Sequence, residues 1–203
     1  MKKPKYTKEW GTSSKKEEKK NRAGVIWTSL IAFIMVTSII GYMWIGNDEP
    51  DFVYKDKYKF SRVNSAFVYE YNSQQFSFRF FPTELEELKD QTDLSALKKP
   101  IISVTFDPET ELQSTDLARF ELSNDLQKIN TYLIQGITKE SDKYNLELLD
   151  CQNATSSNPV IKFEKDNETK IIKEGNCFLF KAKNDYDVIK LKDLLMYTLL
   201  GIY

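Results

Sequence analysis

The stretch VIWTSLIAFIMVTSIIGYMWI, residues 25 to 45, decides how this chain is organised. It contains twenty-one residues without a charged side chain, between Arg22 and Asp48. A helix of that length rises roughly 31 Å, close to the thickness of the hydrocarbon core of a bilayer. We therefore expect a transmembrane helix over residues 23–46, with a short tail before it and one folded domain after it.

Charged and aromatic residues beside the apolar stretch predict its orientation. Residues 1–22 contain eight lysines and one arginine against three glutamates, a net charge of +6. Lys and Arg next to a span are retained on the cytoplasmic side, so the tail should be cytoplasmic and the domain outside the cell membrane. Trp27, Tyr42 and Trp44 fall near the ends of the span, where aromatic rings favour the headgroup region. We interpret them as membrane-interface anchors, with the lipid bilayer as a partner.

Two other interpretations of the apolar stretch stay open. A cleaved signal peptide also begins with basic residues, although its apolar region is normally about 7 to 15 residues long and ends in a small-x-small cleavage site. A type IV pilin-like filament subunit would be processed near Gly24, because residues 19–24, KKNRAG, resemble a pilin leader. Pilins generally place an acidic residue near the fifth mature position, whereas this chain has Thr28 and Ser29 there.

Composition limits what the domain after the span does. Its 157 residues suffice for one core and carry 20 basic against 27 acidic side chains, a net charge of −7. That balance argues against nucleic-acid binding, which favours a basic face. The chain has no histidine, the usual proton shuttle at neutral pH and the commonest zinc ligand, and its sequence contains no phosphate-binding glycine motif. We expect no catalytic residue, no cofactor and no metal.

The chain has two cysteines, Cys151 and Cys177, 26 positions apart and in no CxxC motif. In a domain outside the cytoplasm we expect them to form one structural disulfide, which would stabilise the fold by roughly 3.5 kcal/mol in the chain-entropy model. Two separate buried thiols are the alternative. Asn153 and Asn167 begin N-x-Thr patterns inside the same loop and are candidate N-glycosylation sites.

Alternating aromatic residues follow the span. After a polar stalk over residues 47–57, the period changes to two in the stretches 58–63, 66–71 and 76–80, with turn residues between them. This pattern predicts an antiparallel three-stranded meander. We interpret its aromatic face as core, and the functional alternative is a carbohydrate- or peptide-binding platform. The six rings on that face are Phe67, Tyr69, Tyr71, Phe76, Phe78 and Phe80.

The rest of the domain predicts alternating helices and strands. A helical segment between Pro82 and Pro100 precedes a buried strand, IISVTF, at residues 101–106, and a further strand covers 132–137. The helix between these two strands makes a right-handed βαβ crossover. We expect its core face to consist of Leu117, Phe120, Leu122, Leu126 and Ile129.

Four short strands near residues 146–151, 159–163, 170–172 and 177–180 precede a final helix that begins at Asn184 or Asp185. The predicted fold is α+β, mixing helices with both kinds of sheet. It consists of an N-terminal transmembrane helix, an antiparallel β-meander and a βαβ-containing region closed by the C-terminal helix. Residues 58–203 form the extracytoplasmic domain.

Acidic residues follow the predicted central strand, at Asp107, Glu109, Glu111 and Asp116. Ligands of α/β sheets often bind at strand ends, so a divalent metal or a carboxylate acid/base pair is one interpretation. A solvated turn whose acids complement the dipole of the next helix is the other, and we favour it.

Several motifs occur from Asp150 onward: D-C-x-N-A-T, N-P-V-I-x-F, G-N-C-F-L-F, and a final helix ending L-K-D-L-L-M-Y-x-L-L-G-I. The chain resembles uncharacterised single-pass membrane proteins of small-genome archaea, which similarly join a basic tail and one span to a domain with paired cysteines. The resemblance implies an archaeal membrane protein with its domain on the outer face. It implies no activity and no site residue.

These patterns favour a non-enzymatic, membrane-anchored extracytoplasmic domain. It would bind a protein partner in the cell envelope or serve as a structural component there. The alternatives are a pilin-like filament subunit and an envelope hydrolase that uses carboxylates such as Asp107 or Asp116.

Overall fold

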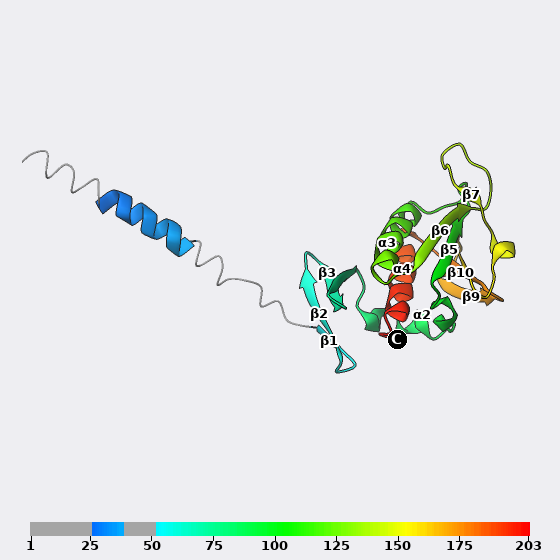
Figure 1. Cartoon of the computed structure of the whole chain (residues 1–203), viewed down its shortest axis with the longest axis horizontal. Coiled ribbons are helices and arrows are strands. Elements are labelled where there is room, and N and C mark those ends of the chain that lie inside the picture. The colour runs from blue at the N-terminus through cyan, green and yellow to red at the C-terminus, as the bar shows by residue number, and fades with distance from the viewer. Residues whose placement is uncertain (1–25, 39–51) are drawn as a thin grey trace, which may run out of the picture. The chain divides into compact units, whose positions relative to one another are not determined.

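The computed structural model describes residues 26–38 and 52–203, which belong to two separate compact units, Met1–Asp48 and Glu49–Tyr203 (Figure 1). Residues 26–38 of the first unit are helical. In these two described ranges, no helix has the length and apolar character needed to cross a bilayer. The basic tail and the other residues of the predicted span lie outside the described residues.

The second unit begins with an antiparallel meander. It has four strands in the order β1-β2-β3-β4, one more than we predicted. The additional strand, β1, falls inside the segment that we assigned to a stalk, because three residues are too few to show a period of two. The strands are β1 (Phe52–Tyr54), β2 (Tyr58–Val63), β3 (Ala66–Tyr71) and β4 (Gln74–Phe78).

Short helical elements, η1 (Pro82–Leu85), α2 (Glu86–Lys89) and η2 (Ser95–Leu97), lead from the meander to a six-stranded sheet. Its strand order is β7-β6-β5-β8-β10-β9. The predicted βαβ crossover is confirmed, because β5 and β6 are parallel neighbours joined by α3. The strands are β5 (Ile101–Phe106), β6 (Tyr132–Ile137), β7 (Glu147–Leu148), β8 (Val160–Lys165), β9 (Lys170–Glu174) and β10 (Cys177–Ala182).

Two long helices, α3 (Ser114–Lys128) and α4 (Asp185–Leu199), lie together beside this sheet (Figure 1). The predicted C-terminal helix is confirmed, and it does more than close one face. α4 packs against β10, while its Tyr197 stacks on Phe78 of the meander with ring centroids 4.0 Å apart. α4 therefore lies between the two sheets, which explains why its residues 187–198 are nearly all buried.

The aromatic face of the meander forms core, as predicted, at five of its six rings. Phe76, Phe78 and Phe80 are at most 1% exposed, and Phe67 and Tyr69 pack against them half-buried. The sixth ring, Tyr71, is the last residue of β3 and is 37% exposed.

The predicted core face of α3 was wrong at two positions. Leu117 is 43% exposed and Phe120 is 65% exposed. The buried stripe instead runs through positions 115, 118, 119, 122, 125 and 126, half of which are polar. A stripe that contains Thr, Arg and Asp does not stand out in a search for apolar spacing.

Tyr197 packs on the rings of Phe60 and Phe78 in the meander, so its truncation should be costly. We expect Tyr197→Ala to lower the free energy of unfolding by about 3 to 5 kcal/mol, as for other buried aromatic residues. Tyr197→Phe keeps the stacked ring and loses only the hydroxyl donation to the Phe80 carbonyl, which should cost about 1 kcal/mol. Chemical denaturation followed by circular dichroism measures both. Tyr132→Ala, at a 68% exposed position, is the control, and an equal loss there would contradict the account.

Candidate functional site

An open groove of about 700 Å³ lies between the meander and α3 in the second unit. One wall is the outward face of β3 and β4 with the turn between β2 and β3, and the other wall is α3. Five of the lining residues have uncharged hydrogen-bonding side chains, four are charged, and three, Ala66, Val68 and Phe76, are apolar. The polar and charged lining residues are Asn64, Ser65, Gln75, Ser77, Arg79, Glu121, Asn124, Asp125 and Lys128.

Simple periodicity places these side chains in the groove. Phe76 and Phe78 point into the core, so the alternating residues Gln75 and Ser77 point outward and are exposed. On α3, Glu121, Asn124 and Lys128 are spaced by three and four residues and therefore share one face.

Two side-chain bridges hold the walls at a fixed distance. Near one end, the guanidinium of Arg79 donates two hydrogen bonds to the carboxylate of Glu121, at 2.9 and 2.7 Å. Near the other end, the Lys128 ammonium donates to the backbone carbonyl of Gln75 at 2.8 Å and pairs with Asp125 at 2.8 Å. A bidentate Arg–carboxylate pair restricts both partners more than a single contact does.

A buried ion network lies behind the first bridge. The Lys192 ammonium, fully buried on α4, lies 3.1 Å from Glu121 and also pairs with the carboxylate of Asp193. Asp193 accepts hydrogen bonds from the backbone N–H groups of Arg79 at 2.8 Å and Phe80 at 3.1 Å. The network thus ties the end of β4 to both long helices.

The titration of these groups follows from burial and pairing. Burial alone would lower the pKa of Lys192, but the carboxylates of Asp193 and Glu121 outweigh it and raise that pKa, so the ammonium persists at neutral pH. Burial would raise the pKa of Glu121, but Arg79 and Lys192 lower it below its ordinary value. Burial raises the pKa of Asp193, against the effect of Lys192 and the two backbone donors.

The acidic residues predicted after the central strand engage cations and a tyrosine. Asp107 and Glu109 both pair with Lys139, at 2.9 and 3.0 Å. The Tyr144 hydroxyl lies 2.6 Å from Glu111 and 2.8 Å from Asp116.

The hollow beside these acids is only about 10 Å³, the room of one water molecule. In the described part of the chain, no group of three or more Cys, Asp or Glu residues is arranged to hold a metal ion. The side chains of Asp107 and Glu111 are only 22% and 10% exposed, so these acids form a partly buried turn with cation and hydroxyl partners rather than a solvated one.

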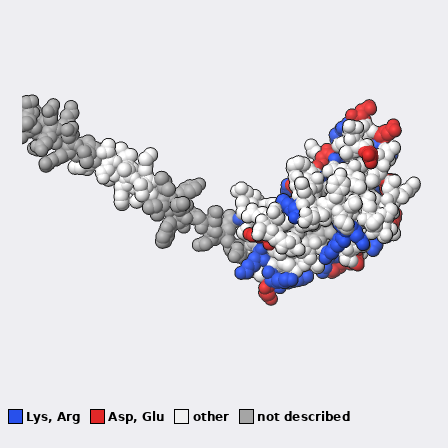
Figure 2. All heavy atoms as spheres, viewed as in Figure 1, with Lys and Arg blue, Asp and Glu red and all other residues white. Residues whose placement is uncertain are grey.

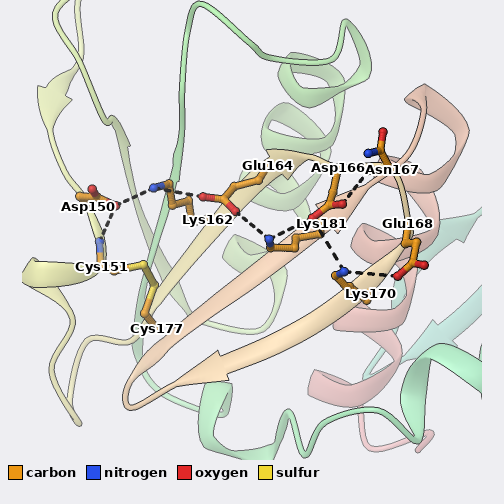
Figure 3. A network of polar contacts seen from close by, with 10 residues as sticks. All are labelled: Asp150, Cys151, Lys162, Glu164, Asp166, Asn167, Glu168, Lys170, Cys177 and Lys181. Atoms are coloured by element: carbon orange, nitrogen blue, oxygen red, sulfur yellow. Dashed lines mark hydrogen bonds and ion pairs between the residues drawn. A yellow bond between two sulfur atoms is a disulfide. The ribbon is translucent and has the colours of Figure 1, made fainter.

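Cys151 and Cys177 form the predicted disulfide, which joins the short helix η3 (Cys151–Asn153) to the start of β10. Figure 3 shows a row of charged side chains beside it, on the sheet face that points away from the helices. The row alternates in sign, and five of its seven side chains are between 19% and 35% exposed. In order the members are Asp150, Lys162, Glu164, Lys181, Asp166, Lys170 and Glu168.

The other predicted site residues are distributed away from the groove. Asn153 and Asn167 are both exposed, inside the loop that the disulfide closes. Trp27 is 66% exposed on the helix of the first unit. Tyr42 and Trp44 lie outside the described residues. Among the described residues that we singled out, Cys151 and Cys177 are bonded to each other, Lys139 joins Asp107 to Glu109, and Tyr144 joins Glu111 to Asp116.

Sequence reasoning missed the groove and the ion network behind it. The residues of the groove come from three segments, and we interpreted them only as parts of strands, turns and a helix. One signal was present: Lys192 and Asp193 interrupt an otherwise apolar stretch of the last helix.

The face seen in Figure 2 carries both signs of charge, with acidic atoms concentrated toward the loop that follows β6.

The low pKa of Glu121 makes stability depend on pH. A carboxylate whose pKa is lower in the folded state stabilises the fold above its unfolded pKa, near 4.3, and this contribution is lost as pH falls through the folded pKa. At pH 7 we expect Glu121→Gln to lower the free energy of unfolding by about 1 to 3 kcal/mol. The difference from wild type should shrink as the pH falls from about 5 toward 3.

Denaturant titrations across that pH range measure this difference. Glu70→Gln on the exposed end of β3 is the matched control, with little change expected at pH 7. A constant gap between Glu121→Gln and wild type at all pH values would contradict the assigned network.

Known proteins supply no template for this groove. No protein-family model, no curated protein and no solved structure matches the chain. The residues of the groove themselves therefore carry what is inferred about its ligand.

Proposed function

We propose that this chain is a membrane-anchored extracytoplasmic domain that binds a protein partner of the cell envelope in the groove between the meander and α3. The apolar stretch at residues 25–45 and the net charge of +6 before it support the anchor and its orientation. The disulfide between Cys151 and Cys177 supports an oxidising compartment.

The observation that carries the binding proposal is the character of the groove. Its four charged side chains are already paired with one another across or along its walls. The amides of Asn64 and Asn124 and the hydroxyls of Ser65 and Ser77 are exposed at its surface, where they offer both donors and acceptors. A hollow with fixed walls and several convergent polar groups is the usual form of a binding site.

The groove lies on rigid elements, which suits recognition. The aromatic core fixes the meander, and the network of Lys192, Asp193, Glu121 and Arg79 fixes the meander against α3 and α4. Binding to a preformed groove does not cost the free energy of ordering the groove, so more of the contact energy contributes to affinity.

Site-specific photo-cross-linking in intact membranes tests the proposal. The full chain carrying a photoreactive residue in place of Asn124 should form a discrete adduct with a membrane or envelope protein on illumination. The same residue in place of Glu174, exposed on β9 outside the groove, is the control. Absence of an adduct at 124, or the same adducts at both positions, would contradict binding in the groove.

A further inference from the structure

The edge of β4 faces the groove with backbone groups that have no neighbouring strand. β4 is an outer strand of its sheet. The turn before it has two residues, Asn72 and Ser73, both with positive φ, and the pair Tyr71 and Gln74 flanks the turn. In such a hairpin the flanking pair exchanges both backbone hydrogen bonds. The alternation of the ladder then turns the backbone groups of residues 75 and 77 away from β3.

Two contacts confirm this direction. The Gln75 carbonyl accepts from Lys128 of α3, and the N–H of Arg79 donates to Asp193 of α4. Ser77 lies midway between these two residues and is exposed. Within residues 52–203, no hydrogen bond beyond the ladder reaches the N–H or the carbonyl of Ser77.

In the six-stranded sheet, side chains bond to outward backbone groups of the outer strand. β9 is at the edge of the six-stranded sheet, and its Ile171 also points its backbone groups outward. There the side chain of Gln91 accepts from the Ile171 N–H at 2.9 Å, and the Thr92 hydroxyl donates to its carbonyl at 3.1 Å. The fold therefore covers an equivalent pair of backbone groups on β9 and leaves the Ser77 pair open toward the groove.

We propose that the groove binds an extended, uncharged polar peptide segment of the partner, which adds a strand to the edge of β4. This inference rests on the proposed function and names the form of its ligand. The N–H and carbonyl of Ser77 would pair with one residue of the segment, as in other cases of strand addition to a sheet edge. The bridges at residues 75 and 79 are about 13 Å apart along β4, the length of roughly four extended residues.

The side chains that line the groove favour uncharged polar side chains in the bound segment. Arg79 with Glu121, and Lys128 with Asp125, already satisfy one another, so a charged side chain entering the groove would find no free partner of opposite sign. Asn124 on α3 and Asn64 on the opposite rim remain to bond with amide or hydroxyl side chains. Alternate residues of the bound strand would face this lining, because side chains on a strand point to opposite sides in turn.

The test uses a phage-displayed library of random ten-residue peptides, selected on the full chain in lipid nanodiscs. Binders that are lost on Asn124→Trp, which fills the groove, are then synthesised with single backbone N-methyl groups at each position. We expect N-methylation to abolish binding at the one position whose amide bonds to the Ser77 carbonyl, because Lys128 already engages the Gln75 carbonyl and Asp193 already engages the Arg79 N–H. A peptide bound through its side chains alone would show no such sensitive amide.

Two variants of the chain separate the backbone of Ser77 from its hydroxyl. Ser77→Pro removes the outward N–H, a position where an outer strand tolerates proline. It should weaken peptide binding by roughly tenfold or more, whereas Ser77→Ala should change it by less than about twofold. Circular dichroism melting of both variants checks the fold, and the N-methyl series decides the question if Ser77→Pro does not fold.

The outcomes distinguish this inference from the proposed function. Equal binding to folded Ser77→Pro and Ser77→Ala, or tolerance of N-methylation at every position, would overturn strand addition. Strand addition would also be overturned if the selection yielded no peptide whose binding is lost on Asn124→Trp. If the photo-cross-link at residue 124 nevertheless forms, binding in the groove stands, and absence of that cross-link would overturn both.

Discussion

The buried carboxylate of Asp193 is the contact on which the arrangement of this domain depends. It accepts from two consecutive backbone N–H groups, those of Arg79 and Phe80, at the point where the meander ends. It also pairs with Lys192, which reaches Glu121 on α3. Removing one partner of such a buried network typically costs about 3 to 5 kcal/mol, because an unpaired charge is left behind. Asp193 thus joins the end of the meander to both long helices.

The position of α4 explains why this network is buried. A helix that closes one face of a sheet keeps a solvated side, where Lys and Asp belong. Here the meander covers that side, and Tyr197 stacks on Phe78 next to the ion pair. The network and the stacked rings together hold the meander on α4, and the open groove is the space left where the meander and α3 do not meet. The polar groups of the groove are therefore held by the same contacts that hold the fold.

Local sequence patterns predicted many of the helices and strands but did not predict the groove. The β-branched run at residues 101–106, the apolar spacing of the last helix and the two cysteines each depend on nearby residues or on simple chemistry, and the structure confirms them. The place of β10 between β8 and β9 could not be predicted, because β8 and β9 follow each other like a hairpin. The groove joins residues about 60 positions apart, and no local period records that contact.

The α3 helix also shows why apolar spacing alone does not identify the buried residues. Leu117 and Phe120 fit a helical period, yet Arg119 and Asp125 occupy the buried stripe. Arg119 is accommodated because its guanidinium lies 4.3 Å from the Phe106 ring centroid and its Nε donates to Gln135. Polar residues with specific partners replace apolar ones in this core, and such partners appear only when the chain is folded. The same reasoning applies to Lys192 and Asp193.

Native-state hydrogen exchange of the full chain tests most directly whether the two walls of the groove form one cooperative unit. We expect the slowest amides of β3, such as Tyr69, and of α3, such as Leu122, to exchange with the same opening free energy. Exchange of the β3 amides through a separate opening at least about 2 kcal/mol lower would contradict it. In that case the meander would open independently, and the groove would not be a preformed site.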